Sequence, residues 1–457
     1  MNAENIGPAV GDAPRPRTSR WRRGRGTVWV AVYLLLVAFP LLLLWRGPVG
    51  GNGWAWDFSL ALGLGGFAIM GLQFALTARF RRATAPFGID IIYYFHRWAA
   101  LSGFGLIAAH YLILKFNYPA ALGPADPREA PWSMTAGRAA LGLFGLLIVT
   151  SLARRALRLE YDRWRIGHGV MAVAAVVLTG AHILGAGHLT ADAWRRLAWT
   201  VYAALWLWVL VYIRIVKPRL LQRMPYRVVE VRPERGRAWT ITLAPTAGSI
   251  PPFRAGQFAW LTIARSPFRA REHPFSFSGS AARQPDLQFT IKALGDFTRT
   301  IGRTPVGTIA YVDGPHGVFT PDTHSDASGF VFIAGGVGIA PIMSMLRTLA
   351  DQNDRRPLLL IDGNRRWDDV MFREEIETLR GRLHLRVVHV LQEPPPDWAG
   401  PTGLLTESVV RPAVPAAFAP AVYFLCGPKP MNDSVQRTLR ALGVPLHRIQ
   451  CELFDMV

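Results

Sequence analysis

Cysteine is nearly absent from this sequence, which has only Cys426 and Cys451 among its 457 residues. Two thiols cannot form a disulfide framework, a four-cysteine zinc site or an iron–sulfur cluster, and no CxxCH segment is present for covalent haem attachment. Charge is also scarce, because 18% of the residues are charged while 51% are hydrophobic. This balance excludes a disordered chain and is untypical of a soluble nucleic-acid-binding protein, although the net charge is +20. Any redox centre must therefore use ligands other than cysteine.

Acidic residues are rare in the first half of the chain. Residues 1–224 hold 25 Lys+Arg and 9 Asp+Glu, a net charge of +16, whereas residues 225–457 hold 26 and 22, a net charge of +4. The first half also contains six apolar stretches of about 20 residues, the length that crosses a hydrocarbon core of ~30 Å. The six predicted membrane helices are residues 27–45, 57–79, 91–115, 134–153, 166–187 and 194–216.

These stretches predict a six-helix transmembrane domain over residues 27–217, preceded by a polar basic tail over residues 1–26. The first stretch follows basic residues, as a signal peptide would, but its apolar run is longer and no A-x-A-like cleavage site follows, so we predict a retained helix. With the N-terminus inside, the inner segments carry 18 Lys+Arg and the outer loops carry 6. The positive-inside rule therefore predicts an integral plasma (inner) membrane protein with its N-terminus and C-terminal half in the cytoplasm.

Four histidines lie inside the apolar stretches. His96 and His110 fall in the third stretch and His168 and His182 in the fifth, so each pair is 14 residues apart. On a helix, 14 positions return to within about 40° of the same face, about 21 Å along the axis. Two facing helices with this pattern form two stacked sites of two imidazoles each. This geometry suits bis-histidine ligation of two haems, His96 with His168 on the cytoplasmic side and His110 with His182 on the outer side.

The alternative interpretation is that these histidines are packed, hydrogen-bonded core residues. Intramembrane ionisable residues are costly and rare, so four of them at two equal spacings favour haem ligation. Zinc or copper would need ligands within a few ångströms of one another, which the pairs along one helix do not provide. Arg97, Arg138, Arg154 and Arg155 lie near the sites and could neutralise haem propionates, or could be interfacial arginines.

The second half of the chain changes pattern after residue 224. Residues 225–322 contain six short alternating runs bounded by turn residues, which predict an antiparallel β-barrel. Residues 328–457 alternate apolar strands with helical patterns, which predict a parallel, Rossmann-like α/β domain.

A glycine-rich turn follows the first strand of the α/β domain, in GFVFIAGGVGIAPIMSML. Gly335, Gly336 and Gly338 allow a close backbone approach to a pyrophosphate, and Pro341 opens the next helix. Glycines in such places also serve tight packing. A later strand ends in Cys426, Gly427 and Pro428, at the carboxyl edge where ligands bind in open α/β sheets, so Cys426 is either a nicotinamide contact or an inert buried thiol.

The motifs HPFSFS, LQFTIKALGDFT, GGVGIAP, CGPKPM and CELF together resemble the flavin- and nucleotide-binding halves of the ferredoxin–NADP reductase superfamily. With the paired histidines, residues 27–457 resemble the NADPH oxidase and ferric reductase family. The resemblance implies FAD, NAD(P)H and two b-type haems as cofactors.

The resemblance also implies roles for individual residues. His273, Pro274, Phe275 and Ser276 would line the isoalloxazine and ribityl chain of FAD, and Lys292, Gly295 and Thr298 would lie near its pyrophosphate. Gly336, Gly338 and Pro341 would hold the nicotinamide nucleotide, with Cys426, Gly427 and Glu452 beside the nicotinamide. Phe454 is similar to the aromatic residue that covers the flavin ring, or it is a core residue, because three residues follow it.

Residues at the strand end LLLIDGNRRWDD are expected to determine whether the protein binds NADPH or NADH. Arg365 and Arg366 could bind a 2′-phosphate, whereas Asp362 could bind a ribose hydroxyl and favour NADH. We expect NADPH.

Together these features predict electron transfer from cytoplasmic NAD(P)H through FAD and two haems to an acceptor on the outer side. A flavin is needed because the nicotinamide gives two electrons and haem takes one. Ferric chelate is the expected acceptor, and reduction of dioxygen to superoxide is the alternative. A membrane-anchored cytoplasmic flavin reductase and a haem-carrying module are further alternatives. Besides the lipid bilayer, no nucleic acid and no obligate protein partner is expected.

Overall fold

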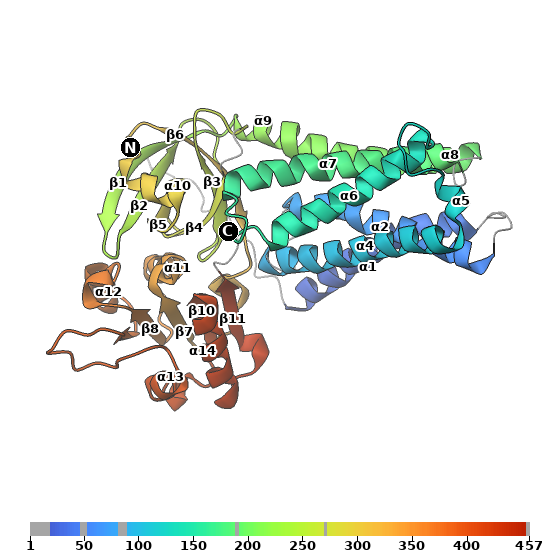
Figure 1. Ribbon diagram of the computed structural model, residues 1–457. Coiled ribbons are helices and arrows are strands. Elements are labelled where there is room, and N and C mark those ends of the chain that lie inside the picture. The colour runs from blue at the N-terminus through green and yellow to red at the C-terminus, as the bar shows by residue number, and fades with distance from the viewer. Residues whose placement is uncertain (1–18, 46–52, 81–88, 188–191, 269–271, 454–457) are drawn as a thin grey trace, which may run out of the picture.

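The computed structural model describes residues 19–45, 53–80, 89–187, 192–268 and 272–453. The first half forms a bundle of long helices, and the second half forms two sheets at one end of it (Figure 1). The helices of the bundle are α1 (Ser19–Trp45), α2 (Trp54–Thr77), α4 (Ile89–Asn117), the short α5 (Pro119–Leu122), α6 (Trp132–Leu152), α7 (Tyr161–Ala186) and α8 (Ala193–Val211). Helix α8 continues through a π-helical turn (Tyr212–Val216) into α9 (Lys217–Leu221).

Five helices among the described residues are long and apolar enough to cross a membrane. They are α2, the Ile91–Asn117 part of α4, α6, α7 and the continuous run Ala193–Leu221. In α1 the apolar part, Gly26–Leu42, is shorter. These five helices of the described part of the chain indicate a membrane protein, and the predicted first span, residues 27–45, stays a prediction. Most of the predicted N-terminal tail lies outside the described residues.

Aromatic residues hold the bundle together on one side. Trp199, Tyr202 and Trp206 of α8 follow one another at helical spacing and pack against α2, where the ring centroids of Phe67 and Tyr202 lie 6.2 Å apart. A Cβ at Gly71 would lie 2.7 Å from the indole nitrogen of Trp206, so this position needs glycine. Close packing of this kind drives helix association in lipid, where the hydrophobic effect gives little.

The first sheet is antiparallel and curled. Its strands are β1 (Tyr226–Glu234), β2 (Ala238–Pro245), β3 (Phe258–Ile263), β4 (His273–Ser276), β5 (Leu287–Lys292) and β6 (Ile309–His316), in the order β4-β3-β6-β1-β2-β5. A bridge between Phe277 and Phe289 brings the two outer strands together. The side chains that alternate inward along these strands form one apolar core. The predicted barrel therefore corresponds to this curled sheet, with the short helix α10 (Asp296–Thr300) after β5.

The second sheet is parallel, as predicted. It contains β7 (Phe330–Gly335), β8 (Leu358–Asn364), β9 (Leu385–Leu391), β10 (Val422–Gly427) and β11 (Ile449–Leu453), in the order β11-β10-β7-β8-β9. Its helices are α11 (Ile339–Asp351), α12 (Arg373–Arg380), α13 (Glu407–Ala413) and α14 (Lys429–Ala441). Strand β11 was not predicted, because a short edge strand with the sequence IQCEL lacks a long apolar run.

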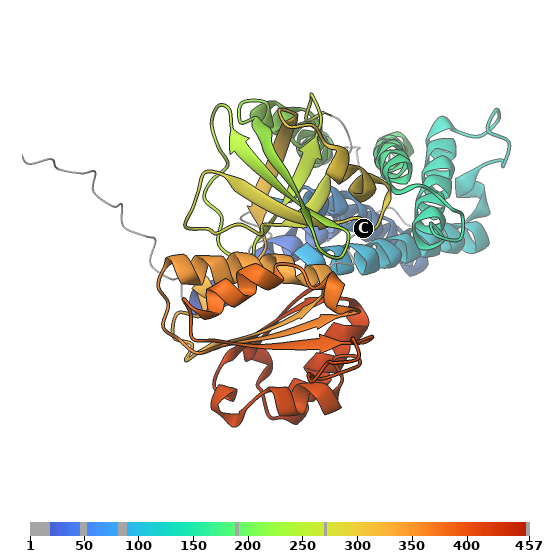
Figure 2. The same ribbon diagram turned by 90° about the vertical axis from the view of Figure 1, so that its left-hand side faces the viewer.

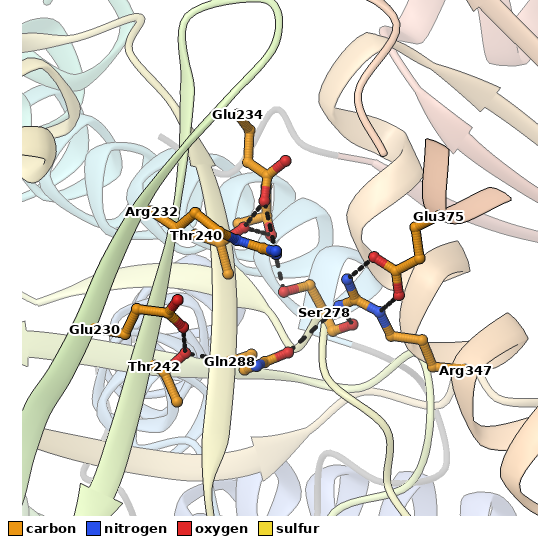
Figure 3. Close-up of polar contacts among 10 residues, drawn as sticks. Glu230, Arg232, Glu234, Thr240, Thr242, Ser278, Gln288, Arg347 and Glu375 are labelled. Carbon is orange, nitrogen blue, oxygen red and sulfur yellow. Dashed lines mark hydrogen bonds and ion pairs between the residues drawn. The ribbon is translucent and has the colours of Figure 1, made fainter. Parts of the chain in front are cut away.

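Helix α11 lies between the two sheets (Figure 2). A polar network joins them there (Figure 3). Arg347 of α11 donates hydrogen bonds to the carbonyl of Ser278, at 2.5 Å, and to Gln288, at 3.4 Å, and it pairs with Glu375 of α12 at 2.6 Å. Gln288 donates in turn to Thr242 of β2 at 3.5 Å. The network holds the two sheets in a defined relation to each other.

Candidate functional site

The structure brings together the histidines that the sequence pairs. His96 and His110 lie on α4, and His168 and His182 lie on α7. His96 is near enough to His168, and His110 to His182, for each pair to interact electrostatically. Helix α4 packs along α2, and α7 packs along α6, so the histidines belong to two helix pairs. In the described ranges, no cluster of three or more His, Cys, Asp or Glu side chains could hold a metal ion.

The His110 and His182 pair, which we call the outer pair after its predicted side of the membrane, is held by backbone carbonyls. The Nδ1 atom of His110 lies 2.8 Å from the carbonyl oxygen of Ser59, and that of His182 lies 2.9 Å from the carbonyl oxygen of Ser133. A carbonyl oxygen only accepts hydrogen bonds, so Nδ1 carries the proton in both rings. The Nε2 atom of each ring then keeps its lone pair, which is the form of histidine that binds a metal.

Glycine makes room for both outer imidazoles. A Cβ at Gly63 of α2 would lie 3.1 Å from Cγ of His110, and a Cβ at Gly137 of α6 would lie 2.8 Å from Nδ1 of His182. His110 and His182 both line one cavity, of about 100 Å³, between α2, α4, α6 and α7. The rings are therefore packed on one side and face an open space on the other.

The two helix pairs repeat the same arrangement. Ser59 precedes Gly63 by four residues on α2, and Ser133 precedes Gly137 by four residues on α6. In each case the serine carbonyl binds the imidazole and the glycine faces it. The sequence analysis missed these four residues. The repeated serine and glycine at equal spacing was a signal that could have found them.

The inner pair is held differently. The hydroxyl of Ser151 lies 3.3 Å from Nδ1 of His168, whereas Nδ1 of His96 is buried and has no hydrogen-bond partner within the described part of the chain. The ring of His168 packs against Trp164, with centroids 5.1 Å apart, and Trp164 packs against Tyr161, with centroids 5.9 Å apart. These aromatic rings lead from the inner pair to the end of α7.

A large pocket lies at that end of the bundle, and we call it the interdomain pocket. It has a volume of about 1010 Å³ and opens to solvent. Its walls come from the antiparallel sheet, from the α6–α7 connection, and from Val337, Ala340 and Glu452 of the nucleotide half. It is lined by every residue that the resemblance implies for FAD, namely His273, Pro274, Phe275, Ser276, Lys292, Gly295 and Thr298. Its lining also includes Phe297, whose ring stacks on His273 with centroids 4.1 Å apart.

The three glycines of the glycine-rich turn differ in how closely the rest of the protein packs against them. A Cβ at Gly338 would lie 1.9 Å from the carbonyl oxygen of Cys426, and a Cβ at Gly335 would lie 2.5 Å from the sulfur of Met431. These two glycines are required by packing against β10 and α14. Gly336 has φ +56° and open space before it, and Pro341 lies in the first turn of α11. Gly336 is therefore the glycine that can expose its backbone to a ligand.

Cys426 is fully buried at the end of β10, opposite Glu452 of β11 in the parallel ladder. Burial, together with the negative charge of Glu452, raises the pKa of the Cys426 thiol well above its ordinary value. The thiol is therefore neutral at physiological pH. Gly427 and Pro428 continue from it toward α14. The predicted flavin-covering residue Phe454 lies outside the described residues.

Two family models match parts of this chain. The family model "Ferric reductase like transmembrane component" matches residues 62–179, and the model "Oxidoreductase NAD-binding domain" matches residues 332–437. The first match covers both helix pairs through Thr179, and the second covers the glycine-rich turn. The chain belongs to the ferric reductase and NADPH oxidase family. It is an oxidoreductase that joins a membrane component of this family to a nucleotide-binding reductase module.

Curated relatives match the C-terminal half of this family member. Ferredoxin–NADP reductase B of Sorangium cellulosum is 30% identical over 246 residues, which cover 52% of the chain and 100% of the relative. The flavohemoprotein of Rhodopirellula baltica is 30% identical over 45% of the chain and 54% of the relative. NADH-cytochrome b5 reductase 1 of Cryptococcus neoformans is 30% identical over 38% of the chain and 62% of the relative. The chain thus spans between half and two thirds of the length of the last two.

Solved structures are also similar to this family member. The ferredoxin reductase in carbazole 1,9a-dioxygenase is 26% identical, with a TM-score of 0.44, over 50% of the chain and 69% of that structure. The flavohemoglobin of Malassezia yamatoensis is 19% identical, with a TM-score of 0.48, over 87% of the chain and 96% of that structure.

In this family member, the residues expected to discriminate between NADPH and NADH already contact other side chains of the protein. Asp362 is buried and accepts a hydrogen bond from Asn364 at 2.8 Å, and His389 lies 3.4 Å away. Arg365 and Arg366 are largely exposed, and both bind Glu393 at 2.7 Å. A 2′-phosphate would therefore compete with Glu393 for the two arginines.

The two halves of the protein are joined by ion pairs that the sequence analysis missed. We call Arg79, Arg165, Lys217, Glu272 and Asp313 the docking network. Glu272 pairs with Arg79 at 2.5 Å and with Arg165 at 3.0 Å, and Asp313 pairs with Lys217 at 2.7 Å. Burial by itself raises the pKa of Glu272, but the charges of Arg79 and Arg165 outweigh it and lower this pKa to about 2. The partners are far apart in sequence, so no local pattern reveals them.

Proposed function

We propose that this protein transfers electrons across a membrane, from NAD(P)H through FAD and two b-type haems to an acceptor on the opposite side, with ferric chelates as the acceptor class. The observation that carries the proposal is the interdomain pocket, because its lining joins the residues implied for FAD to the end of the helix that bears His168 and His182. A flavin held there would lie between the nucleotide half and the bundle.

The residues of the bundle fit haem. Each outer imidazole has its Nδ1 proton bonded to a carbonyl, its Nε2 lone pair free for a metal, and a cavity beside it. The inner pair has a buried Nδ1 of His96 without a partner among the described residues, and a hydroxyl near Nδ1 of His168. When bound, the flavin would take a hydride and give up single electrons, and the haems would carry them.

The protein's own residues position the four histidines. Ser59 and Ser133 fix the proton on Nδ1 of the outer histidines, and Gly63 and Gly137 let helices approach those rings. If both ligand positions of an iron are filled by histidine, no position stays open, so the acceptor would be reduced at the haem edge. This arrangement suits a chelated ferric ion, which needs no coordination to the haem.

We also propose that the N-terminus and the two sheets face the cytoplasm. The support is the distribution of Lys and Arg, which are concentrated at the end of the bundle that carries the docking network. The electron path would then run from the cytoplasm outward.

The test is reconstitution in sealed vesicles with NADPH outside, on the side of the sheets, and ferric chelate or a superoxide detector trapped inside. We expect reduction of the trapped iron that superoxide dismutase does not suppress. A signal that dismutase abolishes would replace the ferric reductase by a superoxide-forming oxidase. No transfer to the lumen, with NADPH oxidation retained, would show an anchored cytoplasmic flavin reductase instead. Absence of a b-type haem spectrum would exclude the haem pathway.

A further inference from the structure

Three arginines of the membrane half line the interdomain pocket. Arg154, Arg155 and Arg158 lie in the connection between α6 and α7, which reaches the pocket at the end of the bundle beside β3 and β4 (Figure 1). Within the ranges that the structure describes, none of the three forms an ion pair with a carboxylate. Three guanidinium groups without a carboxylate partner, on one wall of a pocket, point to an anionic ligand.

The connection holds these arginines in place. The guanidinium of Arg154 lies over the ring of Tyr161, 5.2 Å from its centroid, and 5.8 Å from that of Trp164. Arg158 has φ +51°, a left-handed conformation that is uncommon for arginine. Such conformations persist where the surrounding structure enforces them, and they are frequent at ligand sites. The carboxylates of Glu160 and Asp162 line the same wall, and Glu160 accepts hydrogen bonds from the backbone of Asp162 and Arg163 at the start of α7 and pairs with Arg163.

The charged residues on the sheet side of the interdomain pocket show why positive charge from the bundle is needed. On the side of the antiparallel sheet, the pocket has one permanent cation, Lys292, and one carboxylate, Asp296. These two charges cancel. The pyrophosphate of FAD carries two negative charges, so the sheet alone does not balance it. The bundle side of the pocket carries three arginines, Arg154, Arg155 and Arg158, and two carboxylates, Glu160 and Asp162, so it adds net positive charge to the lining.

We propose that Arg154, Arg155 and Arg158 bind the pyrophosphate of FAD, so that the flavin site is shared between the membrane bundle and the antiparallel sheet. This inference rests on the proposed function in taking FAD as the cofactor. The three arginines would then bind a ligand, in addition to contributing to the positive charge that orients the helices in the membrane. It also means that the flavin itself joins the two halves across the pocket.

The experiment uses the full chain in detergent, stripped of flavin, and titrates it with FAD, FMN and riboflavin by fluorescence quenching. Single variants Arg154→Gln, Arg155→Gln and Arg158→Gln keep most of the inner positive charge that orients the helices. We expect the affinity for FAD to fall by about tenfold in the most affected variant, and the affinity for riboflavin, which has no phosphate, to stay within about twofold. The FAD affinity of the native chain should also fall with salt, and less so in the variants.

Arg163→Gln is the matched control. Arg163 belongs to the same segment and is almost fully exposed, but it pairs with Glu160 and does not line the pocket. Its replacement should leave the affinity for FAD unchanged. The haem spectrum of every variant reports whether the bundle is intact.

Three results would overturn the inference. The first is an unchanged FAD affinity in all three variants. The second is loss or a spectral shift of haem with FAD affinity kept, which would assign the arginines to haem propionates. The third is an effect that appears only in vesicles with anionic lipid and not in neutral ones, which would assign them to lipid headgroups. A native chain that binds no FAD at all would instead refute the proposed function.

Discussion

Arg79 holds Glu272 through both of its terminal nitrogens, at distances of 2.5 and 3.2 Å, although the two residues are 193 positions apart. Arg79 follows the end of α2, and Glu272 immediately precedes β4. The guanidinium also lies over Trp260 of β3, 3.8 Å from the ring centroid. The pair therefore fixes the antiparallel sheet on the bundle, next to the residues expected to hold the flavin.

The first prediction concerns this pair. In Glu272→Gln, the largely buried Arg79 loses its main countercharge, which destabilises a partly desolvated ion pair. We expect haem reduction by NADPH to slow by about tenfold, because the flavin and the bundle lose their fixed relation. Reduction of ferricyanide, which can take electrons from the flavin directly, should be retained. Glu377→Gln is the control, since Glu377 forms an exposed pair with Arg380. Equal losses in both assays would contradict a docking role.

The second prediction is a pH dependence of docking. The pKa of Glu272 is lowered from 4.5 to about 2, because its arginine neighbours outweigh the effect of burial. A carboxyl with a lowered folded pKa contributes its full stability above the unfolded value of 4.5, and that contribution is lost as pH falls toward 2. The rate of haem reduction by NADPH should therefore fall as the pH is lowered below about 4.5, where the ion pair of Glu272 is lost. Protonation of Glu272 should not change this rate between pH 5 and 7. Parallel ferricyanide assays separate this effect from inactivation of the flavin site.

The third prediction tests the outer histidine pair. A methyl group at Gly137 would lie 2.8 Å from the ring of His182, whereas nothing lies within 4 Å of the same position at Gly142, also on α6. Gly137→Ala should lower the affinity for one haem by about tenfold or more, because it displaces the imidazole. Gly142→Ala should not. The haem-to-protein ratio and the b-type spectrum measure this, and equal ratios in the two variants would disprove the assignment.

The fourth prediction concerns nucleotide choice. Glu393 binds both Arg365 and Arg366, so it competes with a 2′-phosphate. Glu393→Gln should raise kcat/KM for NADPH by several-fold and leave that for NADH nearly unchanged. Replacing both arginines by alanine should lower kcat/KM for NADPH by about tenfold to a hundredfold, the value of one or two charged hydrogen bonds. A preference that does not respond to either change would place 2′-phosphate recognition elsewhere.

The fifth prediction concerns the two thiols. Cys426 is fully buried and its pKa is raised by burial and by Glu452, so almost no thiolate forms at pH 7 to 9. Cys451 is partly exposed. Iodoacetamide should therefore label Cys451 in the folded protein and label Cys426 only after unfolding, as mass spectrometry of peptides would show. Rapid labelling of Cys426 in the native protein would contradict its burial.

Local patterns revealed much of this protein. Apolar runs of spanning length predicted α2, α4, α6 and α7 closely, since a helix in lipid must satisfy all its backbone groups internally. Alternating apolar residues predicted most strands of both sheets. In the strand that begins at His273, pairing with β3, and not the apolar pattern alone, sets the register.

The histidine spacing likewise came from sequence, because 14 residues on a helix return to the same face. The sequence by itself thus determined which helices could carry paired imidazoles, where a glycine turn follows a strand, and on which side of the bundle positive charge gathers.

Only the tertiary structure decided what those residues touch. It placed Ser59 and Ser133 on the imidazoles, separated the packing glycines Gly335 and Gly338 from the open Gly336, and set Arg79 on Glu272. It also placed the arginines of the α6–α7 connection on the wall of the interdomain pocket. These contacts join segments far apart in the chain, and their partners are chosen by the packing of whole helices and sheets. Local periodicity and composition therefore do not predict which distant residues come into contact.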